Sequence, residues 1–171
     1  MDGIIYVSEF LSDPGQVFAE LQTTIVWNDS MALRKTASYG VAYNYSQMSY
    51  PFKPFTSLLD QLSISLAAQI GFLANNCLIN YYANGNSRMG FHSDQTDILA
   101  TGTGVAILSL GALRTLRFRE IIDKTNIVDF ALPAGSLLYM DQGVQAKWEH
   151  AIPKADIDMP RISLTFRSIA G

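Results

Sequence analysis

Residues 105–119 read VAILSLGALRTLRFR, and the fold class follows from the pattern in this stretch. Two short candidate strands, at residues 105–110 and 113–119, are separated here by Gly111 and Ala112. Strands of this length that follow each other across a glycine are typical of antiparallel sheets. Further short candidate strands lie around them at residues 77–82, 127–132, 136–140, 145–150 and 162–168. The second half of the chain is therefore predicted to form an antiparallel β-structure.

The first half of the chain predicts helices as well. After a candidate strand at residues 4–7, Asp13-Pro14 marks a helix start, because an aspartate oxygen caps the helix and proline suits its first position. A second helix is predicted at residues 55–70, where apolar residues recur at helical spacing and Gly71 follows as a cap. Together these elements predict an α+β, mainly β fold. Its core would be a double-stranded β-helix (jelly roll) buttressed by two N-terminal helices.

Residues 27–53 differ from the rest of the chain because they are rich in tyrosine, serine and asparagine. We interpret this stretch as short strands and loops that form a lid over a substrate. The sequence shows no linker, internal repeat or low-complexity segment, so residues 1–171 are expected to form one domain. Within it, residues 1–75 would supply the helices and the β/loop substrate lid, and residues 76–171 the jelly-roll catalytic core.

The composition limits the classes of partner. The 171 residues carry a formal net charge of −3, whereas proteins that bind duplex nucleic acid usually present a basic face. A local basic patch of Arg114, Arg117, Arg119 and Lys124 is one interpretation, and solvated strand edges are the other. The single cysteine, Cys77, cannot form an internal disulfide, and no apolar stretch reaches the length of a bilayer span. A cytoplasmic monomer without membrane contact is expected.

Two histidines occur in the chain, and both stand where a metal site needs them. His92 and Asp94 are two residues apart, so in an extended segment both side chains point to one side and can bind one ion. With the distant His150 they would form the facial triad of non-haem Fe(II) oxygenases, which leaves three coordination positions open. A structural zinc site would need a fourth ligand, and Cys77 lies in an apolar, core-like run. A histidine and an aspartate at this spacing also occur often by chance.

Two arginines give the metal interpretation its support. Arg161 and Arg167 are six residues apart on a predicted strand, so they share a face with Ser163 between them. Buried guanidinium groups need an anionic partner, and a dicarboxylate ligand fits them because guanidinium binds carboxylate in a bidentate fashion. Pairing with an internal Asp or Glu is the alternative. Asn80 and Tyr82, which also share one face of a predicted strand, could complete the hydrogen bonds of a bound carboxylate.

These motifs, in this order, resemble the AlkB family of Fe(II)/2-oxoglutarate dioxygenases. The resemblance is carried by Asn80-Tyr81-Tyr82, His92-Ser93-Asp94, His150-Ala151-Ile152-Pro153-Lys154 and the strand from Arg161 to Arg167. It extends upstream to Arg34-Lys35-Thr36-Ala37-Ser38-Tyr39-Gly40 and covers about four-fifths of the chain, from Trp27 onward. The resemblance implies a dioxygenase that uses Fe(II), 2-oxoglutarate and O2.

The resemblance also implies roles for individual residues. The Fe(II) ligands would be His92, Asp94 and His150, and the 2-oxoglutarate contacts would be Asn80, Tyr82, Arg161, Ser163 and Arg167. The substrate contacts would be Trp27, Tyr39, Tyr45 and Arg119. The reaction expected is oxidative demethylation of N-alkylated nucleobases, with single-stranded nucleic acid as a candidate partner. A small-molecule metabolite or a peptide is the alternative substrate. The position where many repair enzymes of the family carry an acidic residue is Thr96, which leaves the substrate open.

Overall fold

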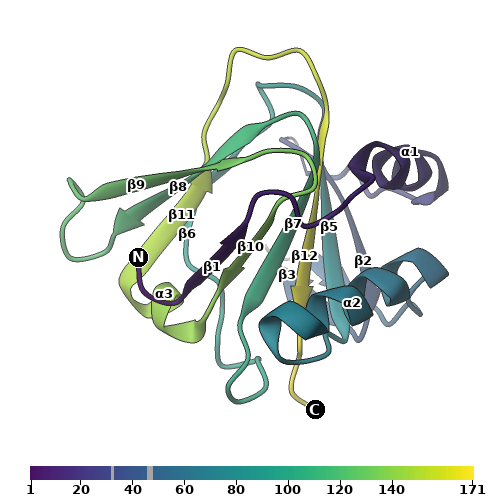
Figure 1. Ribbon diagram of the computed structural model, residues 1–171, viewed down its shortest axis with the longest axis horizontal. Coiled ribbons are helices and arrows are strands. Elements are labelled where there is room, and N and C mark those ends of the chain that lie inside the picture. Colours follow the sequence, from purple (N-terminus) through teal and green to yellow (C-terminus); the bar gives the residue numbers. More distant parts are fainter. Residues whose placement is uncertain (32, 46–47) are drawn as a thin grey trace.

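A computed structural model of the chain describes residues 1–31, 33–45 and 48–171, with the side chain of Tyr45 outside the description. Helices and strands follow one another in an order close to the expected one (Figure 1). They are β1 (Ile4–Val7), α1 (Pro14–Thr24), β2 (Lys35–Gly40), β3 (Tyr43–Tyr45), β4 (Met48–Tyr50), α2 (Ser57–Ile70), β5 (Asn76–Tyr82), β6 (Met89–His92), β7 (Val105–Gly111), β8 (Arg114–Glu120), β9 (Ile127–Leu132), β10 (Leu137–Met140), α3 (Gln142–Lys147), β11 (Trp148–Ile152) and β12 (Arg161–Arg167).

The strands form two antiparallel sheets and a small hairpin. A six-stranded sheet has the order β1-β10-β7-β12-β5-β2, and a four-stranded sheet has the order β6-β11-β8-β9. The strands β3 and β4 pair with each other. Strands that are adjacent in a sheet come from distant parts of the sequence, which is the double-sheet arrangement of a jelly roll. The fold class predicted from the sequence is confirmed.

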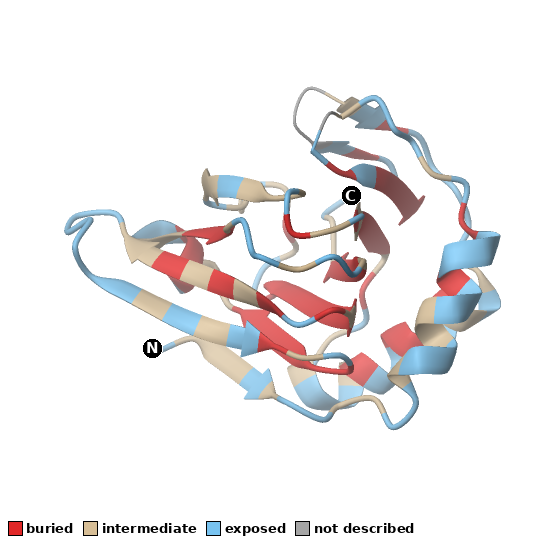
Figure 2. Cartoon of the chain, turned by 90° about the horizontal axis from the view of Figure 1, so that it is seen from above, coloured by how far each residue is buried: buried red, intermediate tan, exposed pale blue. Residues whose placement is uncertain are grey.

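Opposite faces of the six-stranded sheet have different surroundings. Leu21 of α1 and Leu59 of α2 belong to one apolar cluster with alternate residues of the sheet, such as Leu164 of β12. The other face meets the four-stranded sheet, where Ile107 of β7 packs with Phe118 of β8. Figure 2 shows the resulting pattern, with buried strands at the centre and exposed helix faces outside. Each central strand therefore sends every second side chain into the space between the sheets.

Local sequence explains where these elements begin and end. Asp13 caps α1 by accepting a hydrogen bond from the backbone N–H of Gln16, and proline is the first residue of the helix. Gly71 ends α2 in the left-handed conformation, with φ of 88°. Gly111 ends β7 with φ of 80°, and a Cβ atom there would lie 2.5 Å from the carbonyl oxygen of Pro160. The glycine between the first two candidate strands is thus required by a turn and by a close backbone approach.

Two expectations about these elements need correction. The predicted strand at residues 145–150 begins only at Trp148, because residues 142–147 form the short helix α3. The predicted lid is also smaller than residues 27–53. Residues 35–40 form β2, which pairs with β5 as an edge strand of the six-stranded sheet. Of the strands described in this stretch, β3 and β4 are the ones that belong to neither large sheet.

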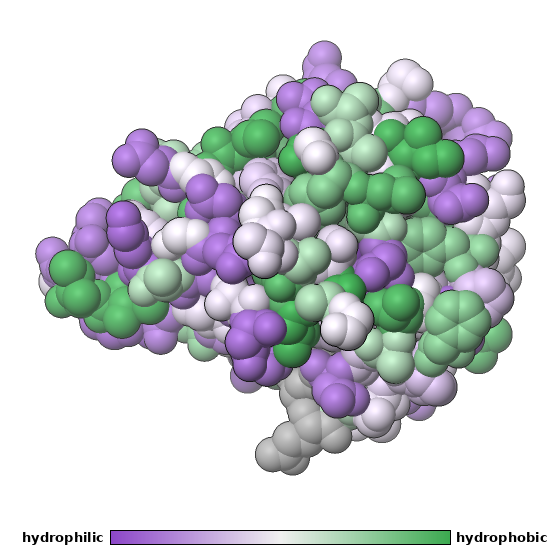
Figure 3. All heavy atoms as spheres, turned by 90° about the horizontal axis from the view of Figure 1, so that it is seen from below, coloured by the Kyte–Doolittle hydropathy of each residue, from purple (hydrophilic) through white to green (hydrophobic). Residues whose placement is uncertain are grey.

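The β8–β9 hairpin projects from the four-stranded sheet (Figure 1). Apolar side chains are exposed at its tip, including Ile122 with an exposed fraction of 90%. Figure 3 shows apolar and polar side chains intermixed over the face seen from below, with apolar atoms at the end where this hairpin projects. None of the helices in the described ranges combines the length and apolar character needed to traverse a bilayer.

Candidate active site

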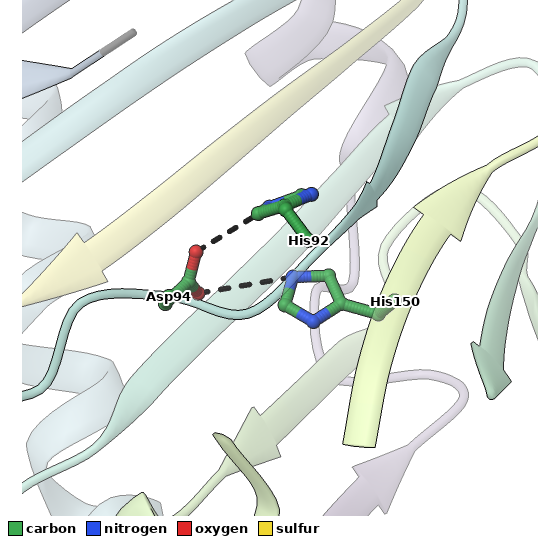
Figure 4. A group of neighbouring side chains, drawn as sticks. All are labelled: His92, Asp94 and His150. Carbon is green, nitrogen blue, oxygen red and sulfur yellow. Dashed lines mark ion pairs between the residues drawn. The ribbon is translucent and has the colours of Figure 1, made fainter. Parts of the chain in front are cut away.

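Three side chains that could ligate a metal converge between the sheets. His92 is the last residue of β6, and His150 lies opposite it on β11, so the sheet register places the two imidazoles side by side. Asp94 follows two residues after His92, in the loop beyond the strand. Its carboxylate oxygens lie 3.5 Å from Nε2 of His92 and 3.8 Å from Nε2 of His150 (Figure 4). One ligand atom from each residue lies within 4.8 Å of the others, which is the spacing of three ligands around one ion.

A hydrogen bond fixes the orientation of the His92 ring. Nδ1 of His92 lies 2.9 Å from the carbonyl oxygen of Gly90. Because a carbonyl can only accept, Nδ1 carries the proton when the ring is neutral, and Nε2 then keeps its lone pair on the side of Asp94. Metal-ligating histidines commonly donate their second ring N–H in this way. The ring is therefore prepared to bind through Nε2.

The surroundings of Asp94 and His150 favour the protonation states that bind metal, whereas those of His92 raise its pKa and so favour its protonated form. Burial alone would raise the pKa of Asp94, but the Arg167 guanidinium and the two imidazoles hold this pKa well below its usual range. Burial lowers the pKa of His150 to about 4, so this imidazole is neutral at physiological pH. Burial also acts to lower the pKa of His92, but the Asp94 carboxylate outweighs it and raises this pKa. A carboxylate anion and at least one neutral imidazole are therefore present.

Strand β12 also sends side chains into the pocket that holds His92, Asp94 and His150. Its alternate residues Arg161, Ser163, Thr165 and Arg167 line the same pocket as the histidine and aspartate side chains. Strand β5 is its neighbour, and the register places Tyr82 opposite Arg161 and Asn80 opposite Ser163. The structure thus brings together all eight residues that the sequence assigned to iron and 2-oxoglutarate.

The two guanidinium groups of β12 retain buried donors without partners. Arg161 has an exposed fraction of 1%, and its Nη2 donates to Oγ of Ser109 over 2.9 Å. Its Nε and Nη1 have no hydrogen-bond partner among the described residues, and the same holds for Nε and Nη1 of Arg167. Nη2 of Arg167 lies 3.4 Å from a carboxylate oxygen of Asp94. The alternative of an internal acidic partner therefore applies to Arg167, whereas Arg161 has no such partner in the described part of the chain.

A dicarboxylate would satisfy these donors. Burial lowers the pKa of Arg161, with Tyr82 acting in the opposite direction, and an unpaired buried guanidinium is costly unless an anion meets it. A carboxylate bound at the end of the Arg161 guanidinium could accept from Nη1 and from the second N–H of Nη2, as guanidinium–carboxylate pairs do. The residues present therefore fit 2-oxoglutarate, with one end at Arg161 and the other toward the metal ligands.

An open cleft adjoins this pocket on the side of the β3–β4 hairpin. It is lined by Met31, Arg34, Tyr43, Asn44 and residues 89–95. Nε of Arg34 donates to Oδ1 of Asn80 over 2.8 Å, so this arginine joins the wall of the cleft to the pocket beneath it. The arginine also donates to the carbonyl oxygen of Arg88 over 3.4 Å. A substrate in the cleft would lie directly above His92 and Asp94.

The four residues expected to contact substrate are placed differently. Trp27 packs against Tyr81, with ring centroids 5.3 Å apart, and Tyr39 belongs to the core under the helices. Both lie on the helix-covered face of the six-stranded sheet, and neither is among the residues that line the cleft. The side chain of Tyr45 lies outside the described residues. Arg119 stacks on Phe91, which lines the cleft, with its guanidinium carbon 3.8 Å from the ring centroid.

The four basic residues considered as a patch do not form one. Arg114 is buried and donates to three backbone carbonyl groups. Arg117 pairs with Asp129 at 2.9 Å, and Arg119 and Lys124 both pair with Glu149, at 2.8 and 2.9 Å. The surface cations of these strands are thus balanced by neighbouring carboxylates.

Sequence reasoning missed two residues of the site and one contact of a third. Thr165 lines the pocket, and the alternation that linked Arg161 to Arg167 would have included it. Arg34 was noted as part of a motif, but its bond to Asn80 depends on the pairing of β2 with β5. Gln145 accepts a hydrogen bond from the backbone N–H of Asp94 over 2.7 Å, and no local pattern signals this contact.

Comparison with known proteins agrees with the fold. A jelly roll that holds two histidines and an aspartate beside buried arginines defines the class of mononuclear iron oxygenases that use a dicarboxylate co-substrate. The chain belongs to the 2OG-Fe(II) oxygenase superfamily, whose family model matches residues 15–167, and within it the chain is AlkB-like. This family uses Fe(II), 2-oxoglutarate and O2.

The individual relatives include several AlkB homologues. The chain is 33% identical to the human DNA oxidative demethylase ALKBH2 in an alignment of 147 residues that covers 80% of this chain and 56% of that protein. It is 34% identical over 147 residues to the human alpha-ketoglutarate-dependent dioxygenase alkB homolog 3, with 80% and 51% covered. The chain spans about half the length of these curated relatives. A solved structure of OsALKBH1 shares the fold, with a TM-score of 0.71 at 15% identity over 98% of this chain and 99% of that one.

Proposed function

We propose that the protein is an Fe(II)/2-oxoglutarate-dependent dioxygenase that oxidatively demethylates N-alkylated nucleobases. The observation that carries this proposal is the pocket that combines the three metal-ligand side chains with the unpaired buried N–H groups of Arg161 and Arg167. Neither the metal ligands nor the buried arginines alone would identify this kind of enzyme, because many proteins bind metal and many bury an arginine. The combination matches a metal ion and an anionic co-substrate held side by side.

In this proposal each polar residue of the pocket has a task. Fe(II) would be held by His92, Asp94 and His150, the ligand types of the non-haem iron oxygenases. The distal carboxylate of 2-oxoglutarate would be bound by Arg161 with help from Tyr82. Further contacts with the co-substrate would come from three other residues that line the pocket, Asn80, Ser163 and Arg167.

When bound together, Fe(II), 2-oxoglutarate and O2 supply the oxidising power, yielding succinate, CO2 and a hydroxylated substrate. The protein's own residues provide position and shielding. Asp94 and the two histidines would hold the ion where the pocket meets the cleft. Arg167 holds Asp94 ionised, and Leu116 and Ile152 line the pocket with apolar surface that limits water. Arg34 orients the Asn80 amide, so that Nδ2 of Asn80 is available to the co-substrate.

The cleft above the metal ligands suits a planar base. Tyr43 and Phe91 are aromatic residues of its lining, and Arg34 is a cation within it. Aromatic and guanidinium groups of this kind stack on bases that have left the helix stack. Hydroxylation of an N-methyl group would give a product that releases formaldehyde. The name of the relative ALKBH2 as a DNA oxidative demethylase supports this substrate class. A cytoplasmic monomer acting on single-stranded nucleic acid completes the proposal.

A metabolite or a peptide is the second candidate substrate, and the balanced surface charges favour it. The net charge is −3, and the surface cations Arg117, Arg119 and Lys124 are paired with carboxylates. A protein that follows a phosphate backbone normally leaves such cations free. Affinity for single-stranded DNA that hardly changes with salt concentration would favour this candidate.

The experiment that separates the two candidates is a substrate screen. Purified protein with Fe(II), 2-oxoglutarate and O2 is offered methylated nucleosides, methylated oligonucleotides and N-methylated metabolites, and succinate is quantified. Substrate-stimulated succinate with methylated oligonucleotides supports nucleobase demethylation. Stimulation by metabolites alone supports the second candidate.

A further inference from the structure

The aspartate of the metal site lies on a segment that the sheet does not hold. Strand β6 ends at His92, so Asp94 has no partner in the antiparallel ladder. Its carboxylate contacts are long, at 3.4 to 3.8 Å. The shortest polar contact that it makes with any described residue is through its backbone N–H, which donates to Oε1 of Gln145 over 2.7 Å. The position of this ligand therefore depends on a side chain from another element.

Gln145 is well placed to fix this segment. It lies on α3 with an exposed fraction of 4%, and Asp141 caps that helix by accepting from the backbone N–H of Val144. The backbone N–H of Asp94 can only donate, so the amide oxygen of Gln145 must face it. The amide nitrogen lies 3.5 Å from Sδ of Met140, a weak acceptor. The oxygen thus makes the stronger of the two contacts of this amide.

A second contact ties the same loop to the same corner of the fold. Oγ of Ser93 donates to the carbonyl oxygen of Trp148, the first residue of β11, over 2.9 Å. Residues at the junction of α3 and β11 thus hold the loop at Ser93 and at the backbone of Asp94 itself. His150 lies two residues further along β11, so the junction also sets the distance between two of the three ligands.

We propose that Gln145 is a positioning residue of the metal site, which places the Asp94 carboxylate through the backbone of its loop. It would touch neither the metal nor the substrate. Outer groups that hold a metal ligand in place commonly contribute 10-fold to 100-fold to metal affinity. This inference rests on the metal site of the proposed function and is independent of the substrate.

Metal affinity measures this role without catalysis. The metal-free full-length protein is titrated with Co(II) alone, and binding is read from the visible absorption of the bound ion. Gln145→Met keeps the length of the side chain but removes the acceptor, and Gln145→Glu keeps an acceptor oxygen. Gln142→Met is the matched control, because Gln142 lies on the same helix and donates to the backbone of residues 100 and 103. Thermal unfolding of each metal-free variant reports changes in stability.

The expected result is that Gln145→Met binds Co(II) about 10-fold more weakly and with an altered absorption spectrum. Gln145→Glu is expected to recover the wild-type spectrum, and Gln142→Met to keep wild-type affinity even where its unfolding temperature falls. Equal affinities for Gln145→Met and wild type would overturn the role of Gln145, as would equal losses for Gln145→Met and Gln142→Met. A wild-type protein that binds no Co(II) would instead contradict the metal site of the proposed function.

Discussion

Replacing Arg161 with methionine should have opposite effects on stability and on co-substrate binding. The guanidinium is buried, carries two unused donors and has no carboxylate partner among the described residues. Without a ligand, its removal relieves the cost of a buried unpaired charge, which is several kcal/mol, and sacrifices one hydrogen bond to Ser109 of about 1 kcal/mol. We expect a net gain of about 1–2 kcal/mol in the free energy of unfolding. For a chain of this size that raises Tm by roughly 3–6 °C.

The same substitution should weaken 2-oxoglutarate binding by about 100-fold. Nη1 and Nη2 of Arg161 would each donate one N–H to the distal carboxylate, and hydrogen bonds to charged groups contribute about 1.5–3 kcal/mol. A net loss of about 3 kcal/mol corresponds to about two powers of ten in Kd. Calorimetric titration of 2-oxoglutarate into Mn(II)-loaded protein measures the affinity, and thermal unfolding of the ligand-free protein measures the stability.

Arg114→Met is the matched control for this pair of effects. Arg114 is equally buried, but its guanidinium donates to the carbonyl oxygens of residues 84, 87 and 153. Its removal should lower Tm, with a much smaller change in 2-oxoglutarate affinity. A ligand-free Arg161→Met protein that melts below wild type, or one that binds 2-oxoglutarate within threefold of wild type, would show that Arg161 is a structural cation and no co-substrate anchor.

Three further outcomes are expected. Apparent Mn(II) affinity should fall as the pH drops through the raised pKa of His92, because one proton then competes with each metal ion. A second proton should compete only near pH 4, where His150 becomes protonated. Competition by two protons at pH 6 would contradict this prediction. Among described residues, the cleft has no carboxylate besides the metal ligand Asp94, so it offers no anion to a cationic base. The kcat/KM should therefore be higher for the neutral base 3-methylthymine than for cationic 1-methyladenine in the same oligonucleotide. A tenfold preference for the cationic base would refute this prediction. Trp27→Ala should lower Tm, because its packing against Tyr81 is lost, and should leave kcat/KM unchanged. A drop in kcat/KM at constant stability would instead place Trp27 at the substrate.

Alternation along single strands predicted the pocket well. Arg161, Ser163 and Arg167 share a face because every second residue of a strand does, and the same rule paired Asn80 with Tyr82. The sequence could not show that β5 and β12 are neighbours in register, which is what places the two sets together. The pairing connects residues far apart in the chain, so no local signal reports it.

The positions of the residues expected to contact substrate were predicted less well, because these positions depend on such distant strand pairings. Tyr39 was assigned to the lid from the composition of its segment, but β2 pairs with β5 and turns this side chain toward the helices. The helix α3 was missed because six residues are too few to establish helical spacing. Asp141, which caps that helix, was the local signal available.

The most direct measurement is the ratio of formaldehyde to succinate formed from a methylated single-stranded oligonucleotide with Fe(II), 2-oxoglutarate and O2. An oxidative demethylase forms the two products in a ratio close to one, above the succinate formed without oligonucleotide, and His92→Ala abolishes both. Iron-loaded wild-type protein that forms no succinate with any methylated substrate, or as much of both products from His92→Ala as from wild type, would contradict a demethylase built on this site.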